Sequence, residues 1–210
     1  INPEKVMKAR KNDVSNYGPL IVGVDPARFG DDRTAIVRRQ TRKVFGIESY
    51  AKIDTMETTG KIVKIINEEK PEMVFVDVGG LGAGVIDRLR ELGYGTDQVI
   101  GVNGGEKPLN GDKYFNKRAE MWGEGKEWLD DDAGVDLPDS DSLQADLTGP
   151  SYSYDSATRL RLEKKEDMKK RGIRSPDEGD AWALTFSFPV SVRDVVEQYG
   201  NVQEGGWLGS

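Results

Sequence analysis

Four aspartates have the type and spacing needed for a cation-binding site. Asp25 ends the apolar run LIVGVD and precedes a proline, and Asp77 ends the apolar run MVFVD and precedes two glycines. Asp177 and Asp180 lie three residues apart in a predicted helix, so they share one of its faces. In α/β proteins ligands gather at the carboxyl ends of strands, where the first two acids are expected. The pattern predicts that acids from two strands and a late helix face one crevice.

Carboxylates brought together in this way need a positive charge between them. Two unit charges about 4 Å apart repel by on the order of 4 kcal/mol at an effective dielectric near 20. The sequence contains no histidine and no cysteine, which excludes imidazole and thiolate zinc sites and also Ser-His-Asp and Cys-His catalysis. A hard divalent ion with oxygen ligands, Mg²⁺ or Mn²⁺, fits the remaining chemistry.

Each of these acids, taken alone, also fits an ordinary structural role. Asp25 and Asp77 could be turn residues that accept backbone N–H bonds. Asp177 could be a first-turn residue favoured by the helix dipole. Asp180 is harder to explain in this way, because it lies among small and apolar residues where an unpaired charge is costly. The site therefore depends on the acids occurring together.

The elements that must position these acids follow from the apolar periodicity. Three closely spaced β-like runs with tight turns predict an antiparallel meander over residues 20–25, 34–38 and 43–53. Alternating helix and strand patterns follow at residues 56–70, 73–77, 84–93 and 98–103, and the first of these helices ends before Pro71. This order predicts an α/β fold whose later strands run parallel.

The second half of the chain is expected to be mainly helical. Apolar residues recur at helical spacing over residues 112–131, which predicts a helix there. A final helix is expected over residues 175–188, with Ser175 as N-cap, Pro176 in the first position and Glu178 completing a capping box.

Charge is distributed unevenly along the chain, although the formal net charge is −7. Residues 124–146 carry nine acids and one lysine, whereas residues 159–174 carry eight lysines or arginines and three acids. Segregation of this kind can guide an anionic ligand to one face of a protein. Ordinary solvated surface is the alternative explanation.

The length of 210 residues is typical of one domain. Residues 1–17 are expected to be an arm or linker, residues 18–190 the folded domain, and residues 191–210 a loosely held tail.

The chain has no apolar stretch near the roughly 18 residues of a membrane span, so we expect a soluble, cytosolic protein. It also lacks G-x-x-x-x-G-K-[ST] and G-x-G-x-x-G, which leaves nucleotide-binding loops unsupported.

Four segments, in this order and at this spacing, carry a resemblance to a known family: IVGVDPARFGDDRTAIV, MVFVDVGGLGAGVIDRL, YFNKRAEMW and SPDEGDAWALTF. Together they resemble the C-terminal nuclease domain of the large terminase subunit, the DNA-packaging motor of tailed bacteriophages. The resemblance implies an RNase H-like, retroviral-integrase-like fold, in which α-helices flank a mixed β-sheet. It also implies an endonuclease that cleaves concatemeric double-stranded DNA during packaging in the host cytoplasm. The implied partners are the terminase ATPase domain, the portal and the small terminase subunit.

The resemblance also assigns roles to residues. It implies that Asp25, Asp77 and Asp180 are catalytic metal ligands, with Asp177 as a further candidate, and that two Mg²⁺ or Mn²⁺ ions catalyse phosphodiester hydrolysis. Basic residues are expected to contact DNA phosphates, and the candidates are Arg28, Arg33, Lys113, Lys117, Arg118, Lys164, Lys165, Lys169, Lys170 and Arg171.

Two other classes of function remain open at this point. A nucleotide-binding module of the actin and sugar-kinase type also places acids at strand ends beside glycine-rich turns. A non-catalytic docking domain of a packaging motor could instead use the acidic, tryptophan-bearing region. ATP binding without DNA cleavage would favour the first alternative.

Overall fold

The computed structural model describes residues 1–27 and 32–191. A mixed sheet of five strands, in the order β3-β2-β1-β4-β5, forms its centre. The strands are β1 (Leu20–Asp25), β2 (Thr34–Gln40), β3 (Lys43–Tyr50), β4 (Met73–Asp77) and β5 (Val99–Val102). β2 is antiparallel to β1 and to β3, whereas β1, β4 and β5 run parallel. The predicted meander and the parallel later strands are both confirmed.

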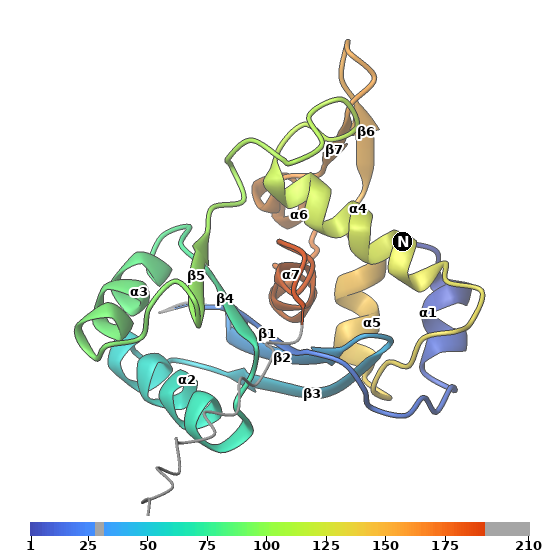
Figure 1. Cartoon of the computed structure of the whole chain (residues 1–210). Coiled ribbons are helices and arrows are strands. Elements are labelled where there is room, and N and C mark those ends of the chain that lie inside the picture. The colour runs from blue at the N-terminus through green and yellow to red at the C-terminus, as the bar shows by residue number, and fades with distance from the viewer. Residues whose placement is uncertain (28–31, 192–210) are drawn as a thin grey trace, which may run out of the picture.

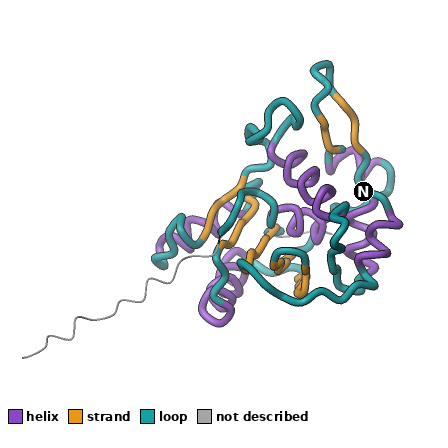
Figure 2. Tube along the Cα trace, turned by 45° about the vertical axis from the view of Figure 1, so that its right-hand side comes forward, coloured by secondary structure: helices purple, strands orange, loops and turns teal. Residues whose placement is uncertain are grey.

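Helices cover both faces of the sheet (Figure 1). On one face, α2 (Thr55–Glu69) and α3 (Gly82–Glu91) pack their apolar residues against alternate residues of β1 and β4. The other face carries α1 (Pro3–Ala9), α4 (Lys117–Leu129), α5 (Asp141–Thr148), α6 (Lys165–Lys170) and α7 (Asp177–Leu184). Figure 2 shows the same helix–sheet–helix arrangement from a second direction. This is the α/β class expected from the sequence.

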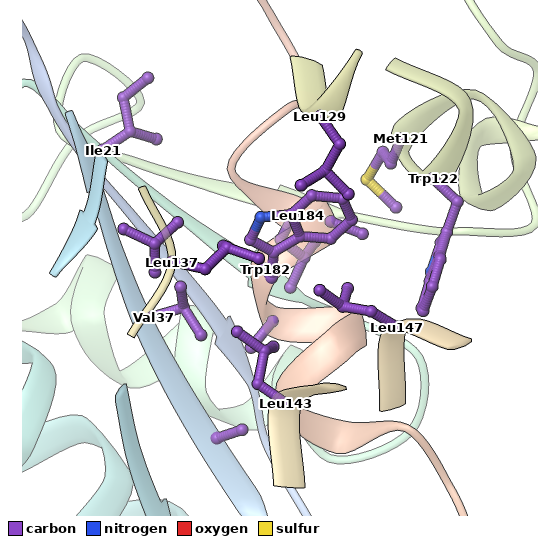
Figure 3. Packing of buried hydrophobic residues seen from close by; sticks show 14 of the residues in the cluster. Ile21, Val37, Met121, Trp122, Leu129, Leu137, Leu143, Leu147, Trp182 and Leu184 are labelled. Atoms are coloured by element: carbon purple, nitrogen blue, oxygen red, sulfur yellow. The ribbon is translucent and has the colours of Figure 1, made fainter. Parts of the chain in front are cut away.

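Helix α7 lies at the centre of the second layer, between the sheet and α4, α5 and α6 (Figure 1). Its Trp182 is fully buried, and Figure 3 shows the indole surrounded by apolar side chains of the sheet and of α4 and α5. The helix also approaches β1 closely at Gly23, where an added Cβ would lie 2.0 Å from the carbonyl oxygen of Ala181. The position of α7, and of the acids it carries, is therefore fixed by a dense core.

The close contact at Gly23 gives a stability prediction. Gly23→Ala should lower the free energy of unfolding by about 1–2 kcal/mol, because overpacking displaces α7 from the sheet. The melting temperature should fall by about 3–6 °C, which thermal denaturation followed by circular dichroism would measure. Gly84→Ala on α3 is the matched control, since an added Cβ there meets nothing within 4 Å. Equal melting temperatures for both variants would contradict the prediction.

Two helices differ from the sequence expectation. Residues 112–116 precede α4 and are not helical, and α4 begins only at Lys117, where the Asn116 side chain accepts a hydrogen bond from Ala119 N–H. Residues 1–17 were expected to be an arm, but they include α1, whose Val6 and Ala9 are buried in the core. The segment is mostly polar, so its composition did not reveal that two apolar residues lie on the same face of one helix.

The capping box expected for the last helix is wrong. The N-cap position of α7 is Pro176, which makes no side-chain capping hydrogen bond, and the helix begins one residue later than predicted. Glu178 is consequently the second helical residue and cannot complete the box. The N-terminus of α7 is capped from outside the helix, as described below.

The oppositely charged segments lie in different parts of the second layer. β6 (Tyr152–Tyr154) and β7 (Leu160–Leu162) form a hairpin. The basic segment, residues 159–174, contains β7 of this hairpin and all of α6. The hairpin projects from the rest of the molecule (Figure 1). The acidic segment spans the end of α4 and most of α5.

Within the described part of the chain, no helix has the length and apolar character needed to cross a bilayer. The expected tail, from residue 192 onward, lies outside the described residues.

Candidate active site

The sheet topology brings the two strand-terminal acids to one edge. β1 and β4 are parallel neighbours with Val24 opposite Val76, so Asp25 and Asp77 both leave the sheet at its carboxyl edge. α7 packs against the same two strands and supplies Asp177. These three acids line a cavity of about 280 Å³, together with Asp32 and Lys165. The predicted convergence of strand and helix acids is thus present in the structure.

Asp180 joins this group through Lys165. The Nζ atom of Lys165 lies 2.8 Å from Asp180 Oδ2 and 3.4 Å from Asp25 Oδ2. The ammonium group therefore stands between an acid of the first strand and an acid of the last helix. The sequence assigned Lys165 to DNA contact, but its position is inside the acidic group.

Asp180 has two further partners on α4. Its Oδ1 atom accepts hydrogen bonds from Arg118 Nε at 3.1 Å and from Trp122 Nε1 at 2.9 Å. Arg118 also donates to the carbonyl oxygen of Glu163 at 2.8 Å. Sequence reasoning placed Arg118 on the DNA surface, whereas its guanidinium mainly neutralises and orients Asp180.

Burial raises the pKa of three of the acids. Asp25 is 6% exposed, and desolvation together with the neighbouring carboxylates Asp180, Asp77 and Asp177 raises its pKa to about 8 although Lys165 opposes the shift. Burial also raises the pKa of Asp77, although a hydrogen bond from Gly79 N–H acts to lower it. Burial likewise raises the pKa of Asp177, although a hydrogen bond from Arg33 N–H acts to lower it. These carboxylates are therefore short of positive charge.

The fourth acid and the lysine are both held in their charged forms. Burial alone would raise the pKa of Asp180, but the charges of Arg118 and Lys165 outweigh it and lower that pKa below the ordinary range. Burial would lower the pKa of Lys165, but the neighbouring carboxylates Asp25 and Asp180 outweigh burial and raise that pKa above its ordinary value. The group thus contains one ionised pair, Asp180 and Lys165, beside three carboxyls whose pKa values are raised.

The residue types of this group fit a divalent metal ion. All the donors are carboxylate oxygens, which Mg²⁺ and Mn²⁺ prefer, and the raised pKa values show that another cation would relieve the buried acids. Across residues 1–27 and 32–191, no three acids stand close enough together to hold an ion as they are. The ammonium group of Lys165 lies between Asp25 and Asp180, where a metal ion would bind. Metal binding would therefore require this group to move away.

The glycines after Asp77 form a tight turn into α3. Gly79 N–H donates to Asp77 Oδ1 at 2.8 Å, and Gly80 has a φ of 87°, which disfavours residues with a Cβ. Both glycines are exposed beside the acids. The turn therefore orients Asp77 and also leaves backbone accessible at the site.

The candidate DNA contacts separate into three groups. Arg28 lies outside the described residues. Lys117 is 3% exposed, and its ammonium group lies 2.6 Å from the buried Glu120, so a DNA contact at Lys117 is wrong. Its position in the first turn of an amphipathic helix did not reveal this burial. The exposed candidates are Arg33, Lys113, Lys164, Lys169, Lys170 and Arg171.

Four of the exposed candidates lie in or next to α6, which also carries Lys165. Lys169 pairs with Asp32, a residue that lines the acidic cavity, at 3.1 Å. Lys170 pairs with Asp167 at 2.7 Å, and Arg171 pairs with Glu163 at 2.6 Å. Their charges are therefore partly neutralised, although the side chains remain exposed.

A second, larger cavity of about 850 Å³ lies elsewhere. It is lined by Arg39, Glu120, Phe186 and Phe188, among others, and by none of the four acids. The buried Arg39 guanidinium donates to Thr185 O at 2.7 Å, at the C-terminal end of α7. A cation in this position offsets the helix dipole, so Arg39 supports the end of α7 that lies away from the acids.

Comparison with solved structures agrees with this architecture. The nuclease domain of the large terminase subunit gp2 of bacterial virus Sf6 superposes with a TM-score of 0.79 at 21% identity, over 90% of this chain and 99% of that domain. The chain has the fold of large-terminase nuclease domains. That fold is RNase H-like, as the sequence resemblance implied.

Other terminase nucleases share the fold at lower identity. The large terminase nuclease of thermophilic phage G20c, solved with bound magnesium, matches with a TM-score of 0.59 and 13% identity over 81% of each chain. The HK97 bacteriophage large terminase matches with a TM-score of 0.63 and 13% identity, over 89% of this chain and 43% of that one. A mutant of the Sf6 domain was solved with manganese. No protein-family model and no curated protein sequence matches this chain.

Proposed function

We propose that this protein is the nuclease domain of a viral large terminase subunit and that it cleaves double-stranded DNA with the help of divalent metal ions. The observation that carries the proposal is the convergence of Asp25, Asp77, Asp177 and Asp180 at one edge of a terminase-nuclease fold. The metal-bound terminase nucleases among the similar structures support the choice of cofactor.

In this mechanism Asp25, Asp77 and Asp180 would hold two Mg²⁺ or Mn²⁺ ions, with Asp177 beside them. Bound ions of this kind supply an activated water and stabilise the departing 3′ oxygen. Asp25 must release its proton before it can serve as a ligand, because its pKa is raised to about 8. Arg118 keeps Asp180 ionised and oriented.

The chain's basic residues have a separate task, which is to bind the DNA backbone. Lys164, Lys169, Lys170 and Arg171 are exposed on or beside α6, the helix whose Lys165 lines the acidic cavity. Lysine and arginine contacts to phosphates bind DNA largely without regard to sequence and weaken with salt. Three of these residues, Lys169, Lys170 and Arg171, form ion pairs with neighbouring acids, so DNA phosphates would have to replace those pairs.

In the virus, we propose that the domain cuts concatemeric DNA at the start and end of genome packaging. Its partners there would be the terminase ATPase domain, the portal and the small terminase subunit. The HK97 large terminase supports this setting, because this chain matches 43% of it and the remainder of that chain lies beyond the match.

A plasmid assay tests the nuclease activity directly. Supercoiled plasmid should be nicked and then linearised with Mn²⁺, and more slowly with Mg²⁺, whereas EDTA should abolish cleavage. Hydrolysis that releases the 3′ oxygen leaves 5′-phosphate and 3′-hydroxyl ends, so DNA ligase should reseal the nicks. ATP binding without any metal-dependent cleavage would contradict the proposal and favour a nucleotide-binding module.

A further inference from the structure

Helix α7 carries two of the four acids and has no cap of its own. Its N-cap residue is Pro176, which makes no side-chain hydrogen bond to the helix. The first turn of a helix presents N–H groups without intrahelical partners, and leaving them unpaired in a buried position is unfavourable. An acceptor for these groups must therefore come from another element.

Asp146 of α5 supplies this acceptor. Its Oδ2 atom accepts hydrogen bonds from Glu178 N–H at 2.9 Å and from Gly179 N–H at 3.3 Å. Its Oδ1 atom accepts from the Arg174 guanidinium at 3.0 Å. Asp146 is 3% exposed, so this carboxylate is buried with both oxygens engaged. One side chain thus joins α5 to the first turn of α7 and to the segment that leads into it.

The two N–H groups that Asp146 binds lie between the acids of the site. Asp177 directly precedes them and Asp180 directly follows them in the chain. Gly179 allows the close approach, because an added Cβ would lie 2.9 Å from the Trp122 ring and 3.2 Å from Asp146 Cβ. A small rotation or shift of this first turn would therefore move both acids relative to the strands.

We infer that Asp146 is a positioning residue of the acidic site: it fixes the first turn of α7 and so sets where Asp177 and Asp180 stand relative to Asp25 and Asp77. The inference rests on the proposed function for its effect on metal binding and cleavage. Its structural part, the placement of Asp180, does not depend on that function. Displacements of about 1 Å in a catalytic group can cost about 10²-fold in rate, so an indirect contact of this kind can control activity.

Trp122 provides a direct measurement of that placement. Its indole Nε1–H donates to Asp180 Oδ1 at 2.9 Å, so the indole ¹H–¹⁵N resonance reports the position of Asp180 without metal or DNA. Trp122→Phe would assign the signal. Asp146→Ala should shift the Trp122 resonance and increase its exchange with solvent, and Asp146→Asn, which keeps one acceptor oxygen, should have a smaller effect.

The metal dependence provides the second measurement. Asp146→Ala should raise the Mn²⁺ concentration that gives half of the thermal stabilisation about tenfold, the scale seen for residues that orient metal ligands. The Mn²⁺ concentration for half-maximal plasmid nicking should rise by a similar factor. Ile62→Val, a core truncation in α2 across the sheet, is the control, since it lowers stability without contact to α7.

The outcomes separate this inference from the proposed function. An unchanged Trp122 resonance in Asp146→Ala would overturn the positioning role, and so would an unchanged Mn²⁺ midpoint combined with a lower melting temperature like that of Ile62→Val. If the wild type fails to cut DNA while Asp146→Ala still shifts the resonance and the Mn²⁺ midpoint, the nuclease proposal is wrong and the positioning role stands. If the wild type binds no Mn²⁺, the resonance alone decides the inference.

Discussion

Asp25→Asn should reduce Mn²⁺-dependent plasmid cleavage by about 10³-fold, the scale of losing a group that stabilises transition-state charge. The same substitution should raise the melting temperature of the metal-free protein at pH 7. The two effects have one cause, since the carboxylate that would hold a cation is buried at 6% exposure and is unfavourable without one. Asparagine keeps the shape of the side chain and removes its charge.

The pH dependence follows from the raised pKa of Asp25. Aspartate in an unfolded chain has a pKa of about 3.9, whereas the folded, metal-free protein raises it to about 8. Between these values the folded state keeps a proton that the unfolded state releases, so stability is lost as pH rises through this window. The stabilisation by Asp25→Asn should therefore grow from pH 5 to pH 8 and level off above it.

Thermal denaturation in EDTA at several pH values would measure this difference. Asp87→Asn, at an exposed position of α3, is the matched control and should change neither cleavage nor the pH profile. Mn²⁺ should stabilise the wild type more at pH 8 than at pH 6, because the ion and the proton compete for Asp25. Wild-type cleavage rates in Asp25→Asn would show that Asp25 is not a metal ligand.

Lys165→Met should have the opposite effect on the metal-free protein. Breaking a buried ion pair by removing one partner costs about 3–5 kcal/mol, and the 33% exposure of the Lys165 side chain reduces this to about 2 kcal/mol. The melting temperature in EDTA should fall by about 4–8 °C. Methionine keeps the apolar stem, so the loss reports the missing charge rather than missing packing.

Metal binding should improve in the same variant. The ammonium group of Lys165 competes with a cation for Asp25 and Asp180, and removing a competitor worth about 1.4 kcal/mol improves affinity tenfold. The Mn²⁺ midpoint of thermal stabilisation should therefore fall about tenfold. Lys164→Met, at the exposed neighbouring position, is the control. A weaker Mn²⁺ response in Lys165→Met would show that the lysine supports the metal site instead of competing with it.

The sequence revealed the strand acids because their positions follow from local rules. An apolar run that ends in an acid before proline or glycine marks the carboxyl end of a strand, and Asp25 and Asp77 stand there. The alternation of helix and strand then implied parallel neighbours, which places both acids at one edge. Periodicity was sufficient for this part of the fold and of the site.

The remaining parts depend on contacts between segments far apart in the chain. Lys165 and Arg118 look like surface basic residues, and only the packing of α6 and α4 against α7 brings them to Asp180. Asp146 is also buried, although it lies in an acidic stretch of sequence that is typical of solvated surface. The capping box failed for a related reason, because the distant carboxylate of Asp146 accepts from Glu178 N–H in place of the local Ser175 hydroxyl.

The central place of α7 has a consequence for how the site comes into being. The acids of this site lie up to 155 residues apart along the chain, from position 25 to position 180, and the centre of one face of the sheet is covered only when α7 docks. Contacts of such long sequence separation form slowly and late. During synthesis almost the whole described chain must therefore leave the ribosome before the four acids can come together. Until then the apolar strands are exposed to chaperones and to aggregation.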